Sequence, residues 1–345
     1  MLLNDYLGIR LPLIQAPMAG IQGSAMTVAV SNVGALGSLP CGMLSQEELR
    51  IELTAIRVQT DQPFNVNFFC HASPTVDEAT MHAWRAALQP YYDELGLSLN
   101  PISSSPSRVP FDAAFAEILS EYKPPVVSFH FGLPSEDLLR YVRSWGAKIM
   151  SSATTVAEAV WLEQHGADVI IAQGLEAGGH RGMFLSDDLS TQLGTLPLLS
   201  RILQAVRVPV VAAGGIADAQ GVAAMMRLGA AGVQVGTAYM LCDEAKTSAL
   251  HRAALSGAGA EHTALTNLLS GRPARGLVNR LMRELGAMSS VAPPFPLATA
   301  DVAPLRARAE ASGSGDFSPL WAGQNTLGCR AIPAAELTAQ LCDGL

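Results

Sequence analysis

A histidine on a glycine-rich loop is the first place in this sequence where chemistry could occur. His180 lies in the stretch 173–182, which begins where the apolar run 167–172 stops. That run has the length and β-branched content of a buried parallel strand, so the loop is expected at the strand's carboxyl end. An imidazole changes its protonation near neutral pH, which makes His180 a candidate proton donor or acceptor. The alternative is a glycine turn carrying a surface histidine.

Three other residues of this loop favour a flat ligand. Gly178 and Gly179 carry no Cβ, so the backbone there can lie close to a ligand or take positive φ. Gln173 provides an amide that both donates and accepts hydrogen bonds, which suits the edge of a heteroaromatic ring. We therefore predict a planar ring beside Gln173 and His180.

A second pair of glycine-containing loops follows downstream. Gly214 and Gly215 come directly after the apolar run 209–213, and Gly236 and Thr237 end the next run. In α/β barrels the loops after the seventh and eighth strands often hold a phosphate, because backbone N–H groups converge there on an anion. A flavin mononucleotide (FMN) would span a phosphate at these loops and a ring near His180. The alternative is that these glycines only turn strands into helices.

The elements that must position these loops are alternating strands and helices. Eight apolar, mostly β-rich runs recur with helix-like segments between them. Such alternation predicts an α/β fold, a TIM (β/α)8 barrel whose carboxyl-end loops meet at one mouth. The predicted strands are Leu13–Ala16, Ala35–Ser38, Asn65–Phe69, Val126–Phe129, Lys148–Met150, Val169–Ala172, Pro209–Ala212 and Gly232–Val235.

Three more polar residues fall on the same predicted rim. The fourth strand leads into His130, and the third contains Asn67 and leads on to His71. A histidine at a strand end is usually structural, but the face shared with His180 makes His130 a second candidate for an active site. Asn67 and His71 could contact a ligand or make ordinary strand-end hydrogen bonds.

Two stretches lie outside the regular alternation. Residues 72–124 form the longest connection, which we expect to cover one side of the barrel. It contains a helix expected over Thr75–Leu95 and a Pro/Ser loop over Asn100–Pro110. Residues 244–300 are Ala-rich and predict a smaller, mainly helical lobe over the barrel mouth. The predicted division is a barrel over 1–242, a helical substrate or lid domain over 243–310, and a C-terminal segment, 311–345, that returns to the barrel.

Composition and charge limit the kinds of partner. Hydrophobic residues make up 49% of the chain and charged residues 15%, which argues against disorder. The formal net charge is −8 and no Lys/Arg cluster occurs, so nucleic acid is not an expected partner. Arg272, Arg275 and Arg280 in the predicted lobe could bind an anion or form ordinary salt bridges.

Cysteine usage and hydropathy indicate the compartment. The five cysteines are widely spaced and form no CxxC pair, which predicts buried free thiols instead of a disulfide framework or a metal site. No run reaches the roughly 18 apolar residues of a membrane span. The N-terminus also lacks the pattern of a signal peptide. We therefore expect a cytoplasmic protein without a membrane partner; a homodimer is an open alternative to a monomer.

In this order, the motifs resemble those of the nitronate monooxygenases, formerly called 2-nitropropane dioxygenases, and specifically the bacterial class I group. The similarity runs along nearly the whole chain. The motifs that carry it are Gln15-Ala-Pro-Met-Ala-Gly20, Asn65-Val-Asn67, Phe129-His-Phe-Gly132, Gln173-Gly174, His180-Arg-Gly182, Ala213-Gly-Gly-Ile216, Gln234-Val-Gly-Thr237, Ser270-Gly-Arg-Pro-Ala-Arg-Gly276 and Trp321-Ala-Gly-Gln324. The resemblance implies noncovalent FMN and a nitronate, such as propionate 3-nitronate, that reduces the flavin before O₂ reoxidises it. The implied products are a carbonyl compound and nitrite.

The resemblance also implies roles for individual residues. His130 and His180 would be the active-site histidines, with His180 holding the charge of the nitronate or removing the α-proton of a neutral nitroalkane. The FMN contacts implied by the resemblance or by the loops above are Met18, Asn67, Gln173, Gly178, Gly179, Gly214, Gly215, Gln234, Val235, Gly236 and Thr237. The chain departs from the family pattern at Phe295, where a tyrosine is expected, and no tyrosine or lysine follows in 296–309.

Two rival functions stay open at this point. An NAD(P)H-dependent FMN reductase, of the quinone or enoyl-carrier-protein reductase type, would share the two downstream loops and Glu176-Ala-Gly-Gly-His180. The His130-Phe-Gly132 segment and Gln173 favour the monooxygenase. The second rival is a flavin-free barrel that binds a sugar phosphate.

Overall fold

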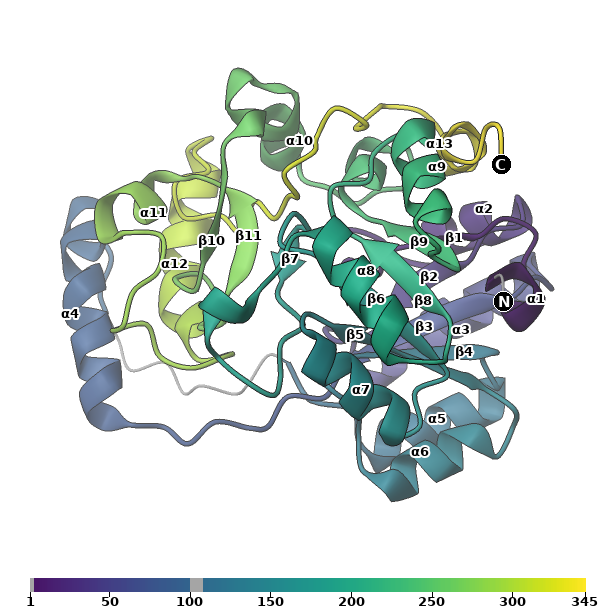
Figure 1. Ribbon diagram of the computed structural model, residues 1–345. Coiled ribbons are helices and arrows are strands. Elements are labelled where there is room, and N and C mark those ends of the chain that lie inside the picture. Colours follow the sequence, from purple (N-terminus) through teal and green to yellow (C-terminus); the bar gives the residue numbers. More distant parts are fainter. Residues whose placement is uncertain (1–2, 100–107) are drawn as a thin grey trace.

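Eight parallel strands form a nearly closed barrel at the centre of this computed structural model, which describes residues 3–99 and 108–345 (Figure 1). The strands pair in the order β1-β9-β8-β6-β5-β4-β3-β2, and a parallel bridge between Ile14 and Leu36 joins the two ends. The barrel strands are β1 (Leu13–Gln15), β2 (Gly37–Pro40), β3 (Phe64–Phe69), β4 (Val126–His130), β5 (Lys148–Ala153), β6 (Val169–Gln173), β8 (Val210–Ala213) and β9 (Gly232–Val235). Each predicted strand overlaps an observed one, so the TIM barrel is confirmed. Most of the predicted loop Asn100–Pro110 lies outside the described residues.

Helices cover the outside of the barrel. The helices that follow barrel strands are α2 (Ser24–Asn32), α3 (Gln46–Gln59), α5 (Ala113–Tyr122), α6 (Glu136–Arg143), α7 (Val156–Gln164), α8 (Thr195–Ala205) and α9 (Ala219–Arg227). The remaining place beside α2 and α9 is taken by α13 (Ala334–Leu341), near the C-terminus (Figure 1). Leu337 and Leu341 on α13 pack in the same core cluster as Met26 and Val222. The end of the chain thus completes the helical ring.

The remaining elements are short or belong to a second lobe. The short ones are α1 (Leu3–Leu7), α10 (Ala249–Ser256) and the 3₁₀ helices η1 (Leu189–Thr191), η2 (Thr237–Leu241) and η3 (Ala258–Glu261). The second lobe contains α4 (Glu78–Glu94), α11 (Arg280–Leu285), α12 (Ala298–Ala311), β10 (Thr263–Thr266) and β11 (Ala274–Leu277), at the left of Figure 1.

Residues 72–124 were expected to cover one side of the barrel, but their helix α4 packs against the second lobe. Its side chains Trp84 and Leu88 are buried against the second lobe, in a cluster with Leu305 of α12. The hydroxyl of Tyr92 donates a hydrogen bond to the carbonyl of Asp301 at 2.7 Å. The apolar face of α4 therefore finds its partner in α12, and only α5, later in the same stretch, packs against the barrel helices.

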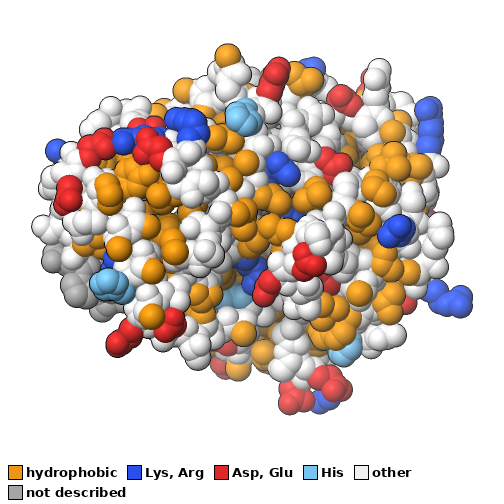
Figure 2. Space-filling view, turned by 60° about the vertical axis from the view of Figure 1, so that its left-hand side comes forward, with side chains coloured by type: hydrophobic (Ala, Val, Ile, Leu, Met, Phe, Trp, Pro, Cys, Tyr) orange, Lys and Arg blue, Asp and Glu red, His pale blue; other side chains and the backbone are white. Residues whose placement is uncertain are grey.

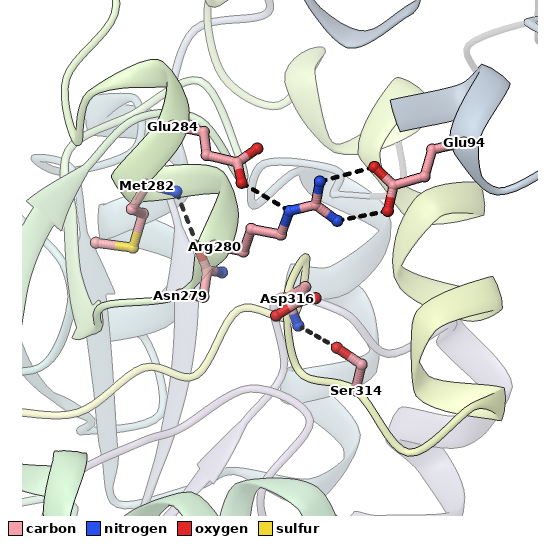
Figure 3. A network of polar contacts seen from close by, with 7 residues as sticks. All are labelled: Glu94, Asn279, Arg280, Met282, Glu284, Ser314 and Asp316. Carbon is pink, nitrogen blue, oxygen red and sulfur yellow. Dashed lines mark hydrogen bonds and ion pairs between the residues drawn. The ribbon is translucent and has the colours of Figure 1, made fainter. Parts of the chain in front are cut away.

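An ion pair also joins α4 to the lobe (Figure 3). Arg280 on α11 donates to both carboxylate oxygens of Glu94 on α4, each at 2.7 Å, and its Nε donates to Glu284 at 2.8 Å. Asn279 caps α11 by accepting from the amide of Met282 at 3.0 Å. The pair is partly exposed, so its contribution to stability is about 1 kcal/mol or less. Arg280 was predicted either to bind an anion or to form a salt bridge, and the structure shows the salt bridge.

A small antiparallel sheet in the lobe was not expected from the sequence. Its order is β10-β11-β7, and its third strand, β7, is Gly179–His180 of the glycine-rich loop itself. In the pairing of β11 with β7, Ala274 lies opposite His180 and Arg275 opposite Gly179. The stretch 244–300 therefore contains strands as well as helices, and one of them holds the backbone of His180.

Candidate active site

One cavity at the carboxyl ends of the barrel strands brings nearly all the predicted site residues together. It is lined by Met18, Asn67, His130, Gln173, Gly178, Gly179, His180, Gly214, Gly215, Gln234, Gly236 and Thr237. Val235 is the exception, because its side chain is buried in the core between strands and helices. Side chains alternate along a strand, so Gln234 and Val235 must point to opposite faces.

A buried arginine fastens the histidine loop to the end of β6. Arg181 is fully buried and donates to the carbonyls of Gln173 and Gly174, at 2.7 and 2.6 Å, and to the side chain of Gln192 at 3.0 Å. Burial lowers the pKa of Arg181 to about 10, which leaves the guanidinium charged at neutral pH. The loop conformation therefore depends on a charged group that only these acceptors satisfy.

The amide of Gln173 was predicted to contact the edge of a ligand ring, but in the structure it forms hydrogen bonds within the histidine loop. Its Nε2 donates to the carbonyl of His180 at 3.0 Å, and its Oε1 accepts from the amide of Gly182 at 2.7 Å. These bonds span the loop, so the side chain serves first to hold His180. Because Gln173 also lines the cavity, its remaining N–H is available to a ligand.

The imidazole of His180 is oriented by a serine of the second lobe. Its Nε2 lies 2.9 Å from the hydroxyl of Ser270, which is also 3.3 Å from the carbonyl of Arg272. A hydroxyl has one proton, so when Ser270 donates to that carbonyl it accepts from His180. In that arrangement neutral His180 carries its proton on Nε2, and Nδ1 is a lone-pair acceptor without a partner among the described residues.

His130 supports His180 and has neither ring nitrogen free. Its Nε2 lies 3.1 Å from the carbonyl of His180, and its Nδ1 lies 3.1 Å from the hydroxyl of Ser152. A carbonyl can only accept, so Nε2 carries the proton and Nδ1 accepts from Ser152. The geometry therefore makes His130 a positioning residue for the backbone of His180.

Aromatic rings enclose the imidazole of His180. The ring centroids of Phe131, Phe295 and Trp321 lie 6.2, 5.3 and 5.4 Å from that of His180. Trp321 comes from the segment 316–324, which returns to the barrel mouth. Phe131 has a φ of 71°, a conformation that costs an aromatic residue about 1–3 kcal/mol and often marks a functional site.

All three histidines around the cavity are held neutral. Burial, followed by the charge of Arg108, holds the pKa of His180 well below its usual value. Burial also lowers the pKa values of His130 and His71 to about 4. At neutral pH His180 is therefore an uncharged imidazole, which can accept a proton or donate a hydrogen bond but brings no positive charge to a ligand.

Acid is expected to destabilise the protein between about pH 6.5 and about pH 4. The pKa values of His71, His130 and His180 are lower in the folded protein than in the unfolded chain. Below about pH 6.5 the unfolded state thus binds more protons, and the free energy of unfolding falls by about 1.4 kcal/mol per pH unit for each titrating histidine.

Urea unfolding at about pH 7 and about pH 5 measures this loss, in a range above the titration of most carboxylates. His71→Gln should lower the dependence of the unfolding free energy on pH by the equivalent of about one proton. The variant removes one of the groups that titrate in this range only after unfolding. The same slope in the variant and the unmodified protein would contradict this assignment for His71.

The glycines of the predicted phosphate loops have the backbone that their role requires. Gly214 and Gly215 have φ values of 122° and 71°, which favour glycine. The C-terminal segment covers this side, since the amide of Gly323 donates to Thr237 Oγ1 at 2.9 Å and Asn325 Nδ2 donates to the carbonyl of Gly215 at 3.0 Å. The hydroxyl proton of Thr237 therefore stays available to an anion.

Gly178 and Gly179 serve two separate needs. A Cβ on Gly178 would lie 2.5 Å from the amide nitrogen of Gly323, so glycine allows the C-terminal segment to approach. Gly179 has a φ of 73° and open space where its Cβ would be. The loop thus uses one glycine for packing and the other for backbone direction.

Several cavity residues escaped the sequence reasoning. Arg108 and Ser152 line the cavity, and Ser270 contacts His180 from the second lobe. Ser270 lies in a motif that carried the resemblance, which was a usable signal. Arg108 lies in the predicted Pro/Ser loop and Ser152 lies near the end of an ordinary strand, β5, so neither showed a pattern that marks a site.

The described residues show neither a membrane-spanning helix nor a cluster of metal ligands. None of its helices is both long and apolar enough to cross a membrane. Within residues 3–99 and 108–345 no three His, Cys, Asp or Glu side chains gather in a way that could hold a metal ion. On the face drawn in Figure 2, basic side chains are scattered among acidic ones.

Known proteins resemble this chain along nearly its whole length. The model of the nitronate monooxygenase family matches residues 1–344. A nitronate monooxygenase from Pseudomonas aeruginosa is 42% identical over 342 residues, covering 98% of this chain and 97% of that protein. Among solved structures, a nitroalkane oxidase from Streptomyces ansochromogenes superposes with a TM-score of 0.88 at 35% identity, covering 98% of this chain and 96% of the other. FabK from Thermotoga maritima gives a TM-score of 0.73 at 26% identity, with 98% and 93% covered. The barrel, the enclosed histidine and these relatives lead to one conclusion: this chain is an oxidoreductase of the nitronate monooxygenase family.

Proposed function

We propose that this enzyme uses FMN to oxidise alkyl nitronates with O₂, giving a carbonyl compound and nitrite. The observation that carries the proposal is the shared cavity, with His180 at one side and the loops of Gly215 and Thr237 at the other. This arrangement suits a planar ring linked to a phosphate. The family and its named relatives support nitronates or nitroalkanes as the substrate class.

The residues present fit a flavin in one further respect. The side-chain Oε1 of Gln234 is buried, lines the cavity, and has no hydrogen-bond partner in the described protein. Such an atom costs about 1–3 kcal/mol unless a ligand satisfies it. A flavin ring carries an N–H that could do so, while Gly214, Gly215, Gly236 and Thr237 would hold the phosphate.

His180 would act on the substrate as a neutral base or hydrogen-bonding group. Its Nε2 proton is directed at Ser270, so Nδ1 could accept the α-proton of a neutral nitroalkane. A nitronate has already lost that proton and would need only orientation. His130 would keep the backbone of His180 in place, and the aromatic wall would exclude water. The bound flavin would supply electron acceptance and the reaction with O₂.

Anaerobic mixing of the purified yellow protein with propionate 3-nitronate, and separately with NADH, tests the function. We expect the nitronate alone to bleach the flavin absorbance, and air to restore it with release of nitrite. The likeness to FabK makes the reductase the alternative to test. Bleaching by NADH alone would favour it, and a colourless protein without bound flavin would leave only a flavin-free barrel.

Gln234→Leu is expected to weaken FMN binding by about 10-fold, the value of one lost hydrogen bond. The apoprotein should keep its stability, because the variant removes a buried acceptor that has no partner. FMN titration and urea unfolding of the apoprotein measure the two effects. Gln173→Leu is the matched control, since its amide is bonded within the loop and its loss should also destabilise the apoprotein. Unchanged FMN affinity in Gln234→Leu would contradict the assignment.

We also propose a reducing, cytoplasmic location, because all five cysteines are free thiols and three are buried. A homodimer stays a prediction.

A further inference from the structure

The guanidinium of Arg108, which lines the active-site cavity, has no acidic partner within residues 3–99 and 108–345. Arg108 lines the cavity, and its only side-chain hydrogen bond within the described residues is a long one, 3.5 Å, to the hydroxyl of Thr299. Burial and the charge of Arg306 lower its pKa, and no acidic group of the described residues opposes them. The neighbouring stretch 100–107 contains no Asp or Glu in its sequence. This buried charge has an aromatic neighbour, Phe295, but no acidic partner among the described residues, which favours an anionic ligand.

The other arginines nearby have partners, although the buried Nε of Arg272 has none among the described residues. Arg272 stacks on Phe131 at 4.1 Å and donates to the carbonyl of Met183. Arg275 donates to the carbonyl of Leu175 at 2.7 Å, and Arg280 pairs with glutamates. Among these arginines only Arg108 lines the cavity, and most of its donors have no partner in the described part of the chain.

Arg108 lies on the substrate side of His180. Its Cζ is 5.3 Å from the ring centroid of Phe295, and the same ring is 5.3 Å from the imidazole of His180. One small ligand could therefore reach both groups across Phe295. The phosphate loops contact a different segment, since Gly215 and Thr237 bond to Asn325 and Gly323. The contacts of Arg108 thus separate it from the predicted phosphate site.

We propose that Arg108 is a specificity-determining residue of this chain, whose guanidinium binds the carboxylate of a substrate such as propionate 3-nitronate. A guanidinium matches a planar carboxylate through two parallel hydrogen bonds. His180 is uncharged, so the substrate's charge must be met elsewhere in the cavity. This inference rests on the proposed function, and it names Arg108 as the group that supplies the charge.

The test compares propionate 3-nitronate with propyl 1-nitronate, which has no carboxylate, in the flavin-loaded enzyme. Arg108→Gln is expected to raise KM for the carboxylate substrate by on the order of 10- to 100-fold, the value of a charged hydrogen bond. KM for propyl 1-nitronate should stay within about twofold. Arg108→Lys should recover part of the loss, because lysine restores the positive charge but cannot form the two parallel hydrogen bonds of a guanidinium. Arg140→Gln is the control, since Arg140 is an exposed arginine of α6.

Calorimetric titration with 3-nitropropionate and 1-nitropropane gives a second readout that needs no turnover. The same selective loss of 3-nitropropionate binding is expected in Arg108→Gln. Equal effects on both ligands, or none on either, would overturn the role of Arg108 while leaving the proposed function intact. If the unmodified enzyme oxidises neither nitronate, the proposed function fails, and the titration still decides whether Arg108 binds a carboxylate. An effect of Arg108→Gln on NADH oxidation alone would assign Arg108 to a nucleotide phosphate and overturn the proposal.

Discussion

Replacing His180 by asparagine is expected to lower kcat/KM for an alkyl nitronate by at least about 100-fold, and for a neutral nitroalkane by more. Its Nδ1 is an acceptor without a partner among the described residues, whereas both nitrogens of His130 are committed. Asparagine keeps a similar size and one donor but cannot accept the α-proton. Steady-state oxygen consumption with both substrate forms measures the effect.

His82→Asn is the matched control, because His82 is an exposed histidine of α4 and should show unchanged kinetics. His130→Asn should be affected less than His180→Asn, since it acts through the backbone of His180. Unchanged turnover of both the nitronate and the neutral nitroalkane in His180→Asn would remove His180 from the mechanism. A loss confined to neutral nitroalkanes would restrict it to the removal of a proton.

Arg181→Met is expected to reduce the free energy of unfolding by about 3–5 kcal/mol, the cost of breaking a buried charged network. Methionine fills a similar volume but leaves the carbonyls of Gln173 and Gly174 and the amide of Gln192 without their donor. The histidine loop would lose its tie to β6, so nitronate turnover should fall as well. Urea unfolding measures the stability of the variant.

The control for this substitution is Arg201→Met on α8, where the arginine is exposed and its replacement should change stability by about 0.5 kcal/mol or less. A loss below about 1 kcal/mol in Arg181→Met would mean that water replaces the guanidinium at these carbonyls. Retained turnover with lowered stability would mean that the remaining contacts, with β11, Gln173 and His130, suffice to hold His180.

Local sequence was sufficient to predict the barrel. Runs such as Val169–Gln173 are short, apolar and β-branched, and they become buried parallel strands because both faces are covered. Helix starts could also be read locally, as where Thr155 and Glu158 form a capping box before α7. Gly214 and Gly215, in the first predicted phosphate loop, have the positive φ that a sharp turn requires.

Contacts between segments far apart in the chain could not be predicted from local sequence. The strand β11 (Ala274–Leu277) contains no β-branched residue, and it is a strand only because β10 and β7 supply its hydrogen-bond partners. The helix α4 showed an apolar face, but nothing local indicated that α12 would cover it. The pairing of each face depends on which surfaces meet when the chain folds.

The fold class, the order of the strands along the chain and the His180 loop could be predicted from the sequence, because they depend on periodicity, glycine and chain direction. The role of each polar group depends on the folded structure. Both nitrogens of His130 and the amide of Gln173 hold His180, and Val235 is buried in the core. Arg108 lines the cavity with no acidic partner among the described residues. Hydrogen bonds and charge pairing depend on atoms a few ångströms apart in space, whatever their separation in the chain.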